Sequence, residues 1–231
     1  MLLINRIQNK GAVYVEFLIV IIPLITLFLC LIQLALVMGA GILTQHGAQK
    51  AVRAAIVVLS DDHEAANYKE PLNSVGSGAK GVGAYRNATK DGRYETIRMA
   101  ARLSLAPVSP TWQALSSDTV RSALSQGVDV GMLLSLAGWT KYGVGLGFLD
   151  FNENYISSFS PIDDIRVELI FLYPCTVPVG RELLCRSYQN LSEHDRTLIE
   201  TNGRIIGWSR FSDRRFVALR AIAALPNQGR R

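Results

Sequence analysis

The hydrophobic pattern of the chain changes sharply close to its amino end. After a leader that contains Arg6 and Lys10, the stretch from Phe17 to Gln45 has no Asp, Glu, Lys or Arg. A helix over residues 17–43 is about 40 Å long, which exceeds the ~30 Å hydrocarbon core of a bilayer. The pattern predicts a transmembrane helix. Its length argues against a cleaved secretory signal, the alternative reading, because the apolar region of a signal spans only ~7–15 residues.

The helical pattern continues beyond the apolar run. Residues 44–59 are rich in alanine and carry polar side chains at helical spacing, which predicts an amphipathic extension. We therefore expect one long helix from about Gly11 to Leu59. Pro23 should bend this helix because it removes one backbone donor and crowds the preceding turn.

The flanks of the apolar run predict its orientation. The leader, residues 1–11, holds two basic residues and no acid. By the positive-inside rule the amino end then lies in the cytoplasm and the rest of the chain outside it. The expected organisation is a leader over 1–11, a membrane helix with its extension over 12–60, and an exported domain over 61–231.

The sequence pattern of the expected exported domain predicts both strands and helices. Alternation over residues 165–173 and 215–225 predicts two strands, which we expect to pair in an antiparallel sheet with partly apolar faces on both sides. Residues 94–105 have a helical pattern that ends before Pro107, and residues 112–124 are a second candidate helix. Residues 61–90 indicate a loop, while the apolar, glycine-rich residues 127–147 fit no single element. The fold class is α+β, with a long N-terminal helix and a small domain.

Composition and charge narrow the function classes. The 231 residues carry a formal net charge of +5, and two of the positive charges belong to the leader. No cluster of Lys and Arg stands out, so nucleic-acid binding has no support. The three histidines are scattered without metal-type spacing, and no nucleophile–base set can be chosen. Residues 76–81 match G-x-G-x-x-G in form, but polar residues precede them and we interpret them as a loop. We expect no enzyme activity, no cofactor and no metal.

The cysteines fit an exported domain. Cys30 lies within the apolar run, and Cys175 and Cys185 enclose a short segment. Outside the cytoplasm this pair would oxidise, and the closed loop would contribute on the order of 3 kcal/mol. Paired zinc ligands are the alternative, but no second cysteine pair or nearby histidine accompanies them. We favour the disulfide.

One carboxylate, Glu16, stands at the start of the apolar run. The simple interpretation is that Glu16 marks the membrane boundary and reaches water, because a charge near the interface costs less than one at the bilayer centre. The residues around Glu16 in the sequence indicate a role beyond marking the membrane boundary. A glycine, Gly11, lies five positions earlier, a basic leader precedes it, and Phe17 follows directly.

Gly11, Glu16 and Phe17 resemble the processing site of type IV pilins, in which a prepilin peptidase cuts after the glycine. More closely, residues 11–24, Gly-Ala-Val-Tyr-Val-Glu-Phe-Leu-Ile-Val-Ile-Ile-Pro-Leu, are similar to the TadE-like pseudopilins of the Tad (Flp pilus) system. The resemblance implies a mature chain that begins at Ala12. It also implies assembly through Glu16 and Phe17 in the bacterial inner membrane, with a periplasmic domain. The implied partners are other pilins and pseudopilins, platform proteins of the same membrane, and the peptidase.

Two other functions remain open on the sequence. The chain could be an uncleaved single-pass membrane protein whose periplasmic domain binds a ligand or an envelope component. It could also be a membrane-tethered enzyme, which would require a pocket with convergent titratable groups. The mature N-terminus separates the first two interpretations: Ala12 indicates a processed pilin-like subunit, and an intact leader indicates the uncleaved protein.

Overall fold

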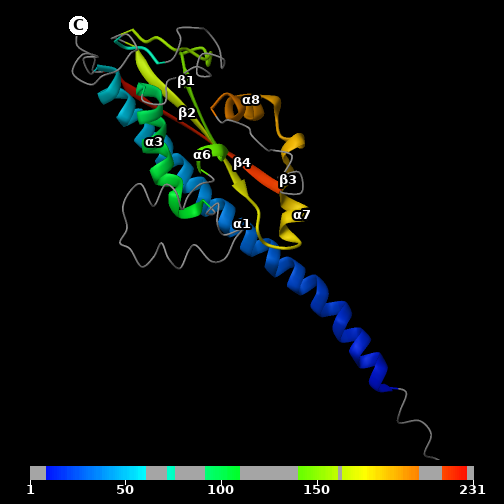
Figure 1. Cartoon of the computed structure of the whole chain (residues 1–231). Helices are drawn as coiled ribbons and strands as arrows, with labels where there is room; N and C mark the ends of the chain where they lie inside the picture. Colours follow the sequence, from blue (N-terminus) through cyan, green and yellow to red (C-terminus); the bar gives the residue numbers. More distant parts are fainter. Residues whose placement is uncertain are drawn as a thin grey trace, which may run out of the picture.

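A single helix dominates the molecule. The structure is a computed structural model that describes residues 9–60, 72–75, 92–109, 140–160, 163–202 and 215–227. Helix α1 (Asn9–Ser60) is 52 residues long and continues through Pro23. The prediction of one long N-terminal helix is therefore confirmed. Its carboxyl-terminal half lies along the domain and its amino-terminal half projects from it (Figure 1).

The domain is built on a four-stranded sheet with the strand order β1-β2-β4-β3. The strands are β1 (Val144–Leu149), β2 (Asp164–Pro174), β3 (Arg186–Ser187) and β4 (Arg215–Pro226). All neighbouring strands are antiparallel, and β2 pairs with β4 from Asp164↔Pro226 to Pro174↔Phe216. The two predicted strands and their antiparallel pairing are confirmed, and the coarse fold class is α+β.

Shorter helices complete the described part of the chain. The predicted helix over residues 94–105 is confirmed as α3 (Arg93–Leu105). The other helices are η2 (Ala106–Val108), α6 (Thr140–Gly143), α7 (Gly180–Leu184), η3 (Tyr188–Asn190) and α8 (Glu193–Asn202). The candidate helix over 112–124, the motif at 76–81 and most of the predicted loop over 61–90 lie outside the described residues.

The sheet is covered on both faces, as the pattern of β2 predicts. Helices α1 and α3 cover one face, where the Tyr94 hydroxyl donates to the Leu146 carbonyl at 2.7 Å and the Tyr94 and Phe148 rings meet edge to face. Helix α8 lies on the opposite face, against Gly145 of β1. Alternate β2 side chains therefore enter different layers, and residues 167–174 are buried along the strand.

The alanine-rich half of α1 belongs to the hydrophobic core. Its buried residues recur at helical spacing, with Ala48, Ala51, Val52, Ala55 and Leu59 among them. Such small side chains let the helix axis approach the sheet closely. The amphipathic pattern of residues 44–59 is thus the face that packs on the domain, so the predicted helix extension and the predicted domain share one core.

Candidate functional site

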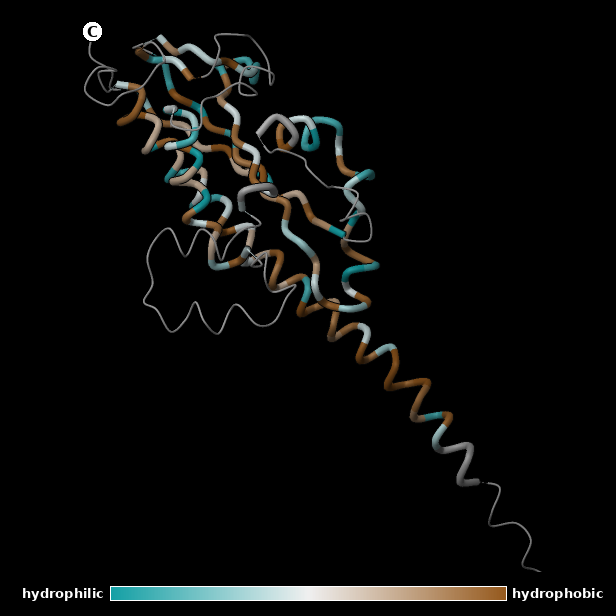
Figure 2. The backbone as a smooth tube through the Cα atoms, in the orientation of Figure 1, coloured by the Kyte–Doolittle hydropathy of each residue, from teal (hydrophilic) through white to brown (hydrophobic). Residues whose placement is uncertain are grey.

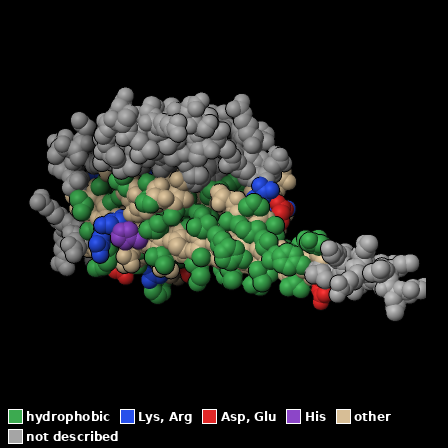
Figure 3. All heavy atoms as spheres, turned by 90° about the horizontal axis from the view of Figure 1, so that it is seen from below, with side chains coloured by type: hydrophobic (Ala, Val, Ile, Leu, Met, Phe, Trp, Pro, Cys, Tyr) green, Lys and Arg blue, Asp and Glu red, His purple; other side chains and the backbone are tan. Residues whose placement is uncertain are grey.

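The projecting half of α1 is the part of the molecule that carries the predicted site. From Tyr14 to Ile32 most of its large apolar side chains are exposed. Figure 2 shows mainly hydrophobic residues along this part of the helix, and Figure 3 shows hydrophobic side chains on the face in view. A helix of this length extends about 28 Å, close to the ~30 Å of a hydrocarbon core. Within the described residues this is the one helix that is long and apolar enough to cross a membrane.

The junction residues lie at the start of this segment. Gly11 and Ala12 belong to the first turn of α1, and their side chains fall outside the described part. The Glu16 side chain is exposed, and Phe17 is 61% exposed. Among the described side chains none pairs with Glu16. The junction therefore presents an exposed carboxylate and an exposed aromatic ring on the projecting helix.

The disulfide is formed between Cys175 and Cys185, with a Cα–Cα distance of 6.5 Å. The prediction of a disulfide is confirmed, and the alternative of paired zinc ligands is thereby excluded. The bond closes residues 175–185, which we call the disulfide loop, directly after β2. Helix α7 occupies the second half of this loop.

The disulfide loop packs on α1 where the projecting half ends. The Gln33 side chain is buried, and its Oε1 accepts a hydrogen bond from the Val177 backbone N–H at 3.1 Å. Gly180 lies against the same turn, so that a Cβ there would stand 2.9 Å from the Gln33 Cβ and 3.3 Å from the Leu29 carbonyl oxygen. A polar residue within the apolar run thus serves as the attachment point of the loop.

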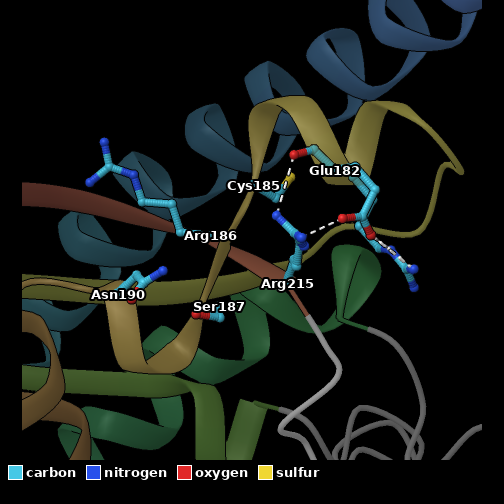
Figure 4. A pocket seen from close by; sticks show the side chains of 7 residues that line it. Glu182, Cys185, Arg186, Ser187, Asn190 and Arg215 are labelled. Carbon is cyan, nitrogen blue, oxygen red and sulfur yellow. Dashed lines mark hydrogen bonds and ion pairs between the residues drawn. The ribbon is translucent and has the colours of Figure 1, made fainter.

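An arginine-rich pocket of about 630 Å³ opens beside the loop (Figure 4). It is lined by Arg181, Glu182, Cys185, Arg186, Ser187, Asn190 and Arg215. Glu182 forms ion pairs with Arg215 and with Arg181, the latter at 3.1 Å, and its backbone oxygen accepts from Arg215 at 3.3 Å. These bonds tie the loop to the first residue of β4. Arg186 points away from them (Figure 4).

A second polar cluster surrounds Glu168 on the α8 face of the sheet. The Glu168 side chain is 0% exposed, and it accepts a hydrogen bond from the Tyr155 hydroxyl at 2.5 Å. Arg220 of β4 forms an ion pair with it, and His194 Nε2 of α8 lies 3.2 Å from Glu168 Oε1 and 2.9 Å from the Tyr155 oxygen. Because an ionised carboxylate only accepts, a proton on His194 Nε2 satisfies this arrangement.

Two glycines make room for the Glu168 cluster. Gly147 faces Glu168 across the β1–β2 pair, and a Cβ at that position would overlap the Tyr155 ring. Gly145, two residues earlier, would meet the α8 backbone at 3.2 Å. The missing side chains let Tyr155 and α8 lie flat on β1. The cluster therefore joins four segments of the domain through one buried carboxylate, and a structural role accounts for all its bonds.

The sequence pattern assigns Glu168 to the predicted strand over residues 165–173, but it identifies neither the partners of Glu168 nor Gln33 as an attachment point. An available signal for Gln33 was its place as an amide within an apolar run, where a polar side chain needs a partner. The Glu168 cluster offered no such signal, because Tyr155, His194 and Arg220 lie far apart along the chain.

Comparison with protein-family models, with curated proteins and with solved structures gives no match to this chain.

Proposed function

We propose that this chain is a TadE-like pseudopilin, a minor pilin-type subunit of a Tad (Flp) pilus or a related secretion apparatus. The projecting half of α1 would anchor it in the bacterial inner membrane, with the amino end cytoplasmic and the domain periplasmic. A prepilin peptidase would cut after Gly11. The subunit would then join other pseudopilins and the platform proteins of that membrane.

The observation that carries this proposal is the division of α1. One half packs into the domain through small residues, while the other half, from Tyr14 to Ile32, leaves most of its large apolar side chains exposed and carries a single carboxylate near its start. An uninterrupted helix of this kind delivers both a membrane anchor and a rod that can lie against identical rods. A subunit that assembles by staggered helix packing needs both.

The chemistry of the junction supports the same conclusion. Cleavage after Gly11 creates an ammonium group on Ala12, four residues before Glu16 and on the same helix face. An isolated charge is costly in this poorly solvated place, but the ammonium of one subunit and the Glu16 carboxylate of its neighbour offset that cost. The exposure of Glu16 leaves it accessible to such a partner.

The mature N-terminus tests the processing step. The full chain is expressed in membranes with a prepilin peptidase, purified and analysed by mass spectrometry. We expect a chain that begins at Ala12, and Gly11→Leu should retain the leader. Gly39→Leu is the matched control, because Gly39 lies in the same helix with no atom near its Cβ position, and it should be cut normally. An intact leader in the unmodified chain would instead favour an uncleaved membrane protein with a ligand- or envelope-binding domain.

A second variant tests assembly. Glu16→Ala should insert into the membrane like the unmodified chain but co-purify less with pilus components, because the neighbour's ammonium loses its partner. Val20→Ala, one turn further along the exposed helix, removes apolar volume without charge and should assemble normally. Equal recovery of pilus components with Glu16→Ala and with the unmodified chain would refute a role of Glu16 in assembly.

A further inference from the structure

The disulfide loop lies at a defined height along α1. It contacts the helix at Leu29 and Gln33, where the segment that begins at Tyr14 first packs on the domain. Beyond Gln33 one face of α1 is buried against the domain, while large apolar side chains on its other face stay exposed as far as Ile42. From Tyr14 to Ile32 the helix, which does not yet pack on the domain, is about 28 Å long, close to the thickness of a hydrocarbon core. If this segment crosses the membrane, the disulfide loop therefore lies at the level of the lipid headgroups on the domain side.

The exposed side chains of the disulfide loop are of the types that occur at the level of the lipid headgroups. Leu183 is 66% exposed, and Val179 and Leu184 are exposed beside it. Arg181 of the loop and Arg186, which directly follows it, flank Leu183 and Leu184 in the chain, and both arginines are exposed. Exposed aliphatic side chains together with arginines are typical of segments that lie in a membrane interface, where the former enter the acyl region and the latter bind phosphate.

One of these exposed apolar residues, Val179, has a strained backbone conformation. Val179 has φ 65° and ψ −56°, in the left-handed half of conformational space that a β-branched residue rarely adopts. The Gly180 N–H donates to the Pro178 carbonyl at 2.7 Å and closes a γ-turn around Val179. Strain of this kind persists only where surrounding bonds enforce it, here the disulfide and the contact with Gln33.

We propose that the disulfide loop is a membrane-interface anchor that binds the surface of an anionic phospholipid bilayer. Leu183 and Val179 enter the boundary of the acyl chains, and Arg181 and Arg186 bind lipid phosphates. This inference rests on the membrane-spanning part of the proposed function. Its consequence is that the loop fixes the depth of α1 and the distance of the domain from the bilayer, because the disulfide and Gln33 join loop and helix rigidly.

Depth-dependent quenching by brominated lipids tests the proposal on the full chain. Single tryptophans are introduced as Leu183→Trp in the loop, Ile25→Trp within the projecting half of α1, and Phe151→Trp as a distal reference. Phe151 is 81% exposed and lies near the β1–β2 connection, at the end of β2 opposite the loop. Each protein is reconstituted in vesicles of phosphatidylcholine with and without phosphatidylglycerol, and quenching of the unmodified chain is subtracted.

We expect strong quenching of Ile25→Trp, and quenching of Leu183→Trp that exceeds that of Phe151→Trp by at least about twofold. Phosphatidylglycerol should increase the Leu183→Trp signal. Adding Arg186→Gln should reduce that increase, whereas Arg166→Gln, at the distal end of β2, should not.

The possible failures are distinguishable. Absence of quenching at Ile25→Trp overturns the membrane span and the loop anchor together. Quenching at Ile25→Trp with Leu183→Trp no stronger than Phe151→Trp overturns the loop anchor alone and leaves the proposed function intact. A Leu183→Trp signal that phosphatidylglycerol and Arg186→Gln leave unchanged refutes the assignment of anionic headgroups as the partner.

Discussion

Gly180 of the disulfide loop lies so close to Gln33 of α1 that no side chain fits between them. A Cβ at position 180 would stand 2.9 Å from the Gln33 Cβ and 3.3 Å from the Leu29 carbonyl oxygen. The absence of a side chain at Gly180 thus allows the loop to reach the helix and the Val177 N–H to reach the Gln33 amide.

Gly180→Ala should therefore push the disulfide loop away from α1. Overpacking of a tight contact costs about 1–3 kcal/mol, and we expect a loss of stability in this range. Thermal unfolding of the full chain in detergent measures it. Gly39→Ala is the control, because open space surrounds that position and a helical alanine stabilises relative to glycine by about 0.5–1 kcal/mol. Equal melting temperatures for Gly180→Ala and the unmodified chain would contradict the packing described.

Reduction of the Cys175–Cys185 bond should destabilise the domain. Closing a loop of this length removes chain entropy from the unfolded state that corresponds to about 3 kcal/mol, so Cys175→Ser with Cys185→Ser should unfold at lower urea than the oxidised chain. A reductant should lower the urea midpoint of the unmodified chain and leave the double variant unchanged. Cys30→Ser should respond to reductant as the unmodified chain does, because Cys30 is a free thiol.

The parts of the fold that sequence predicts well are those whose signal is local. The residues of β2 alternate in the pattern of a strand that ends at Pro174. An apolar run followed by alanines at helical spacing predicts α1. Both elements could be assigned from their own residues. The pairing of β2 with β4 was expected because an isolated strand leaves its backbone N–H and C=O groups without partners, and these two were the predicted strands of the domain.

Strand β1 could not be assigned in this way. Val144, Leu146 and Phe148 alternate correctly, but Gly145 and Gly147 weaken the intrinsic preference for a strand. The reason for glycine at these two positions is found only in the folded structure, where Tyr155 and α8 pack against the same face of β1. The candidate site divides similarly: Gly11 and Glu16 form a local motif, whereas the height of the disulfide loop on α1 depends on contacts across the fold.

Asp150 should give the β1–β2 connection an acid sensitivity. Hydrogen bonds from Asn154, chiefly from its backbone N–H at 2.8 Å, hold the pKa of Asp150 below its ordinary value. A carboxyl with a lowered folded pKa adds stability that is fully present above the unfolded pKa of about 3.9 and is lost as pH falls through the folded pKa. Asp150→Asn keeps an acceptor oxygen, so its stability deficit should be constant near neutral pH and vanish in acid. Urea unfolding across this pH range measures it, and a deficit independent of pH would refute the charge effect.

Tyr155→Phe should reveal how much the buried Glu168 carboxylate depends on its donors. The variant removes one hydroxyl at 2.5 Å from a side chain without solvent exposure, while Arg220 and His194 remain. Loss of a hydrogen bond to a charged group costs about 1.5–3 kcal/mol, and we expect a destabilisation of this size in urea unfolding. Tyr173→Phe is the matched control on β2, because within the described part of the chain its hydroxyl has no hydrogen bond and its ring stays against Phe171. Tyr173→Phe should lower the free energy of unfolding by less than Tyr155→Phe does. If both variants lose equal stability, the loss reflects removal of a hydroxyl from a packed ring and not the bond to the carboxylate. The Glu168 cluster then does not hold α8 to the sheet through Tyr155.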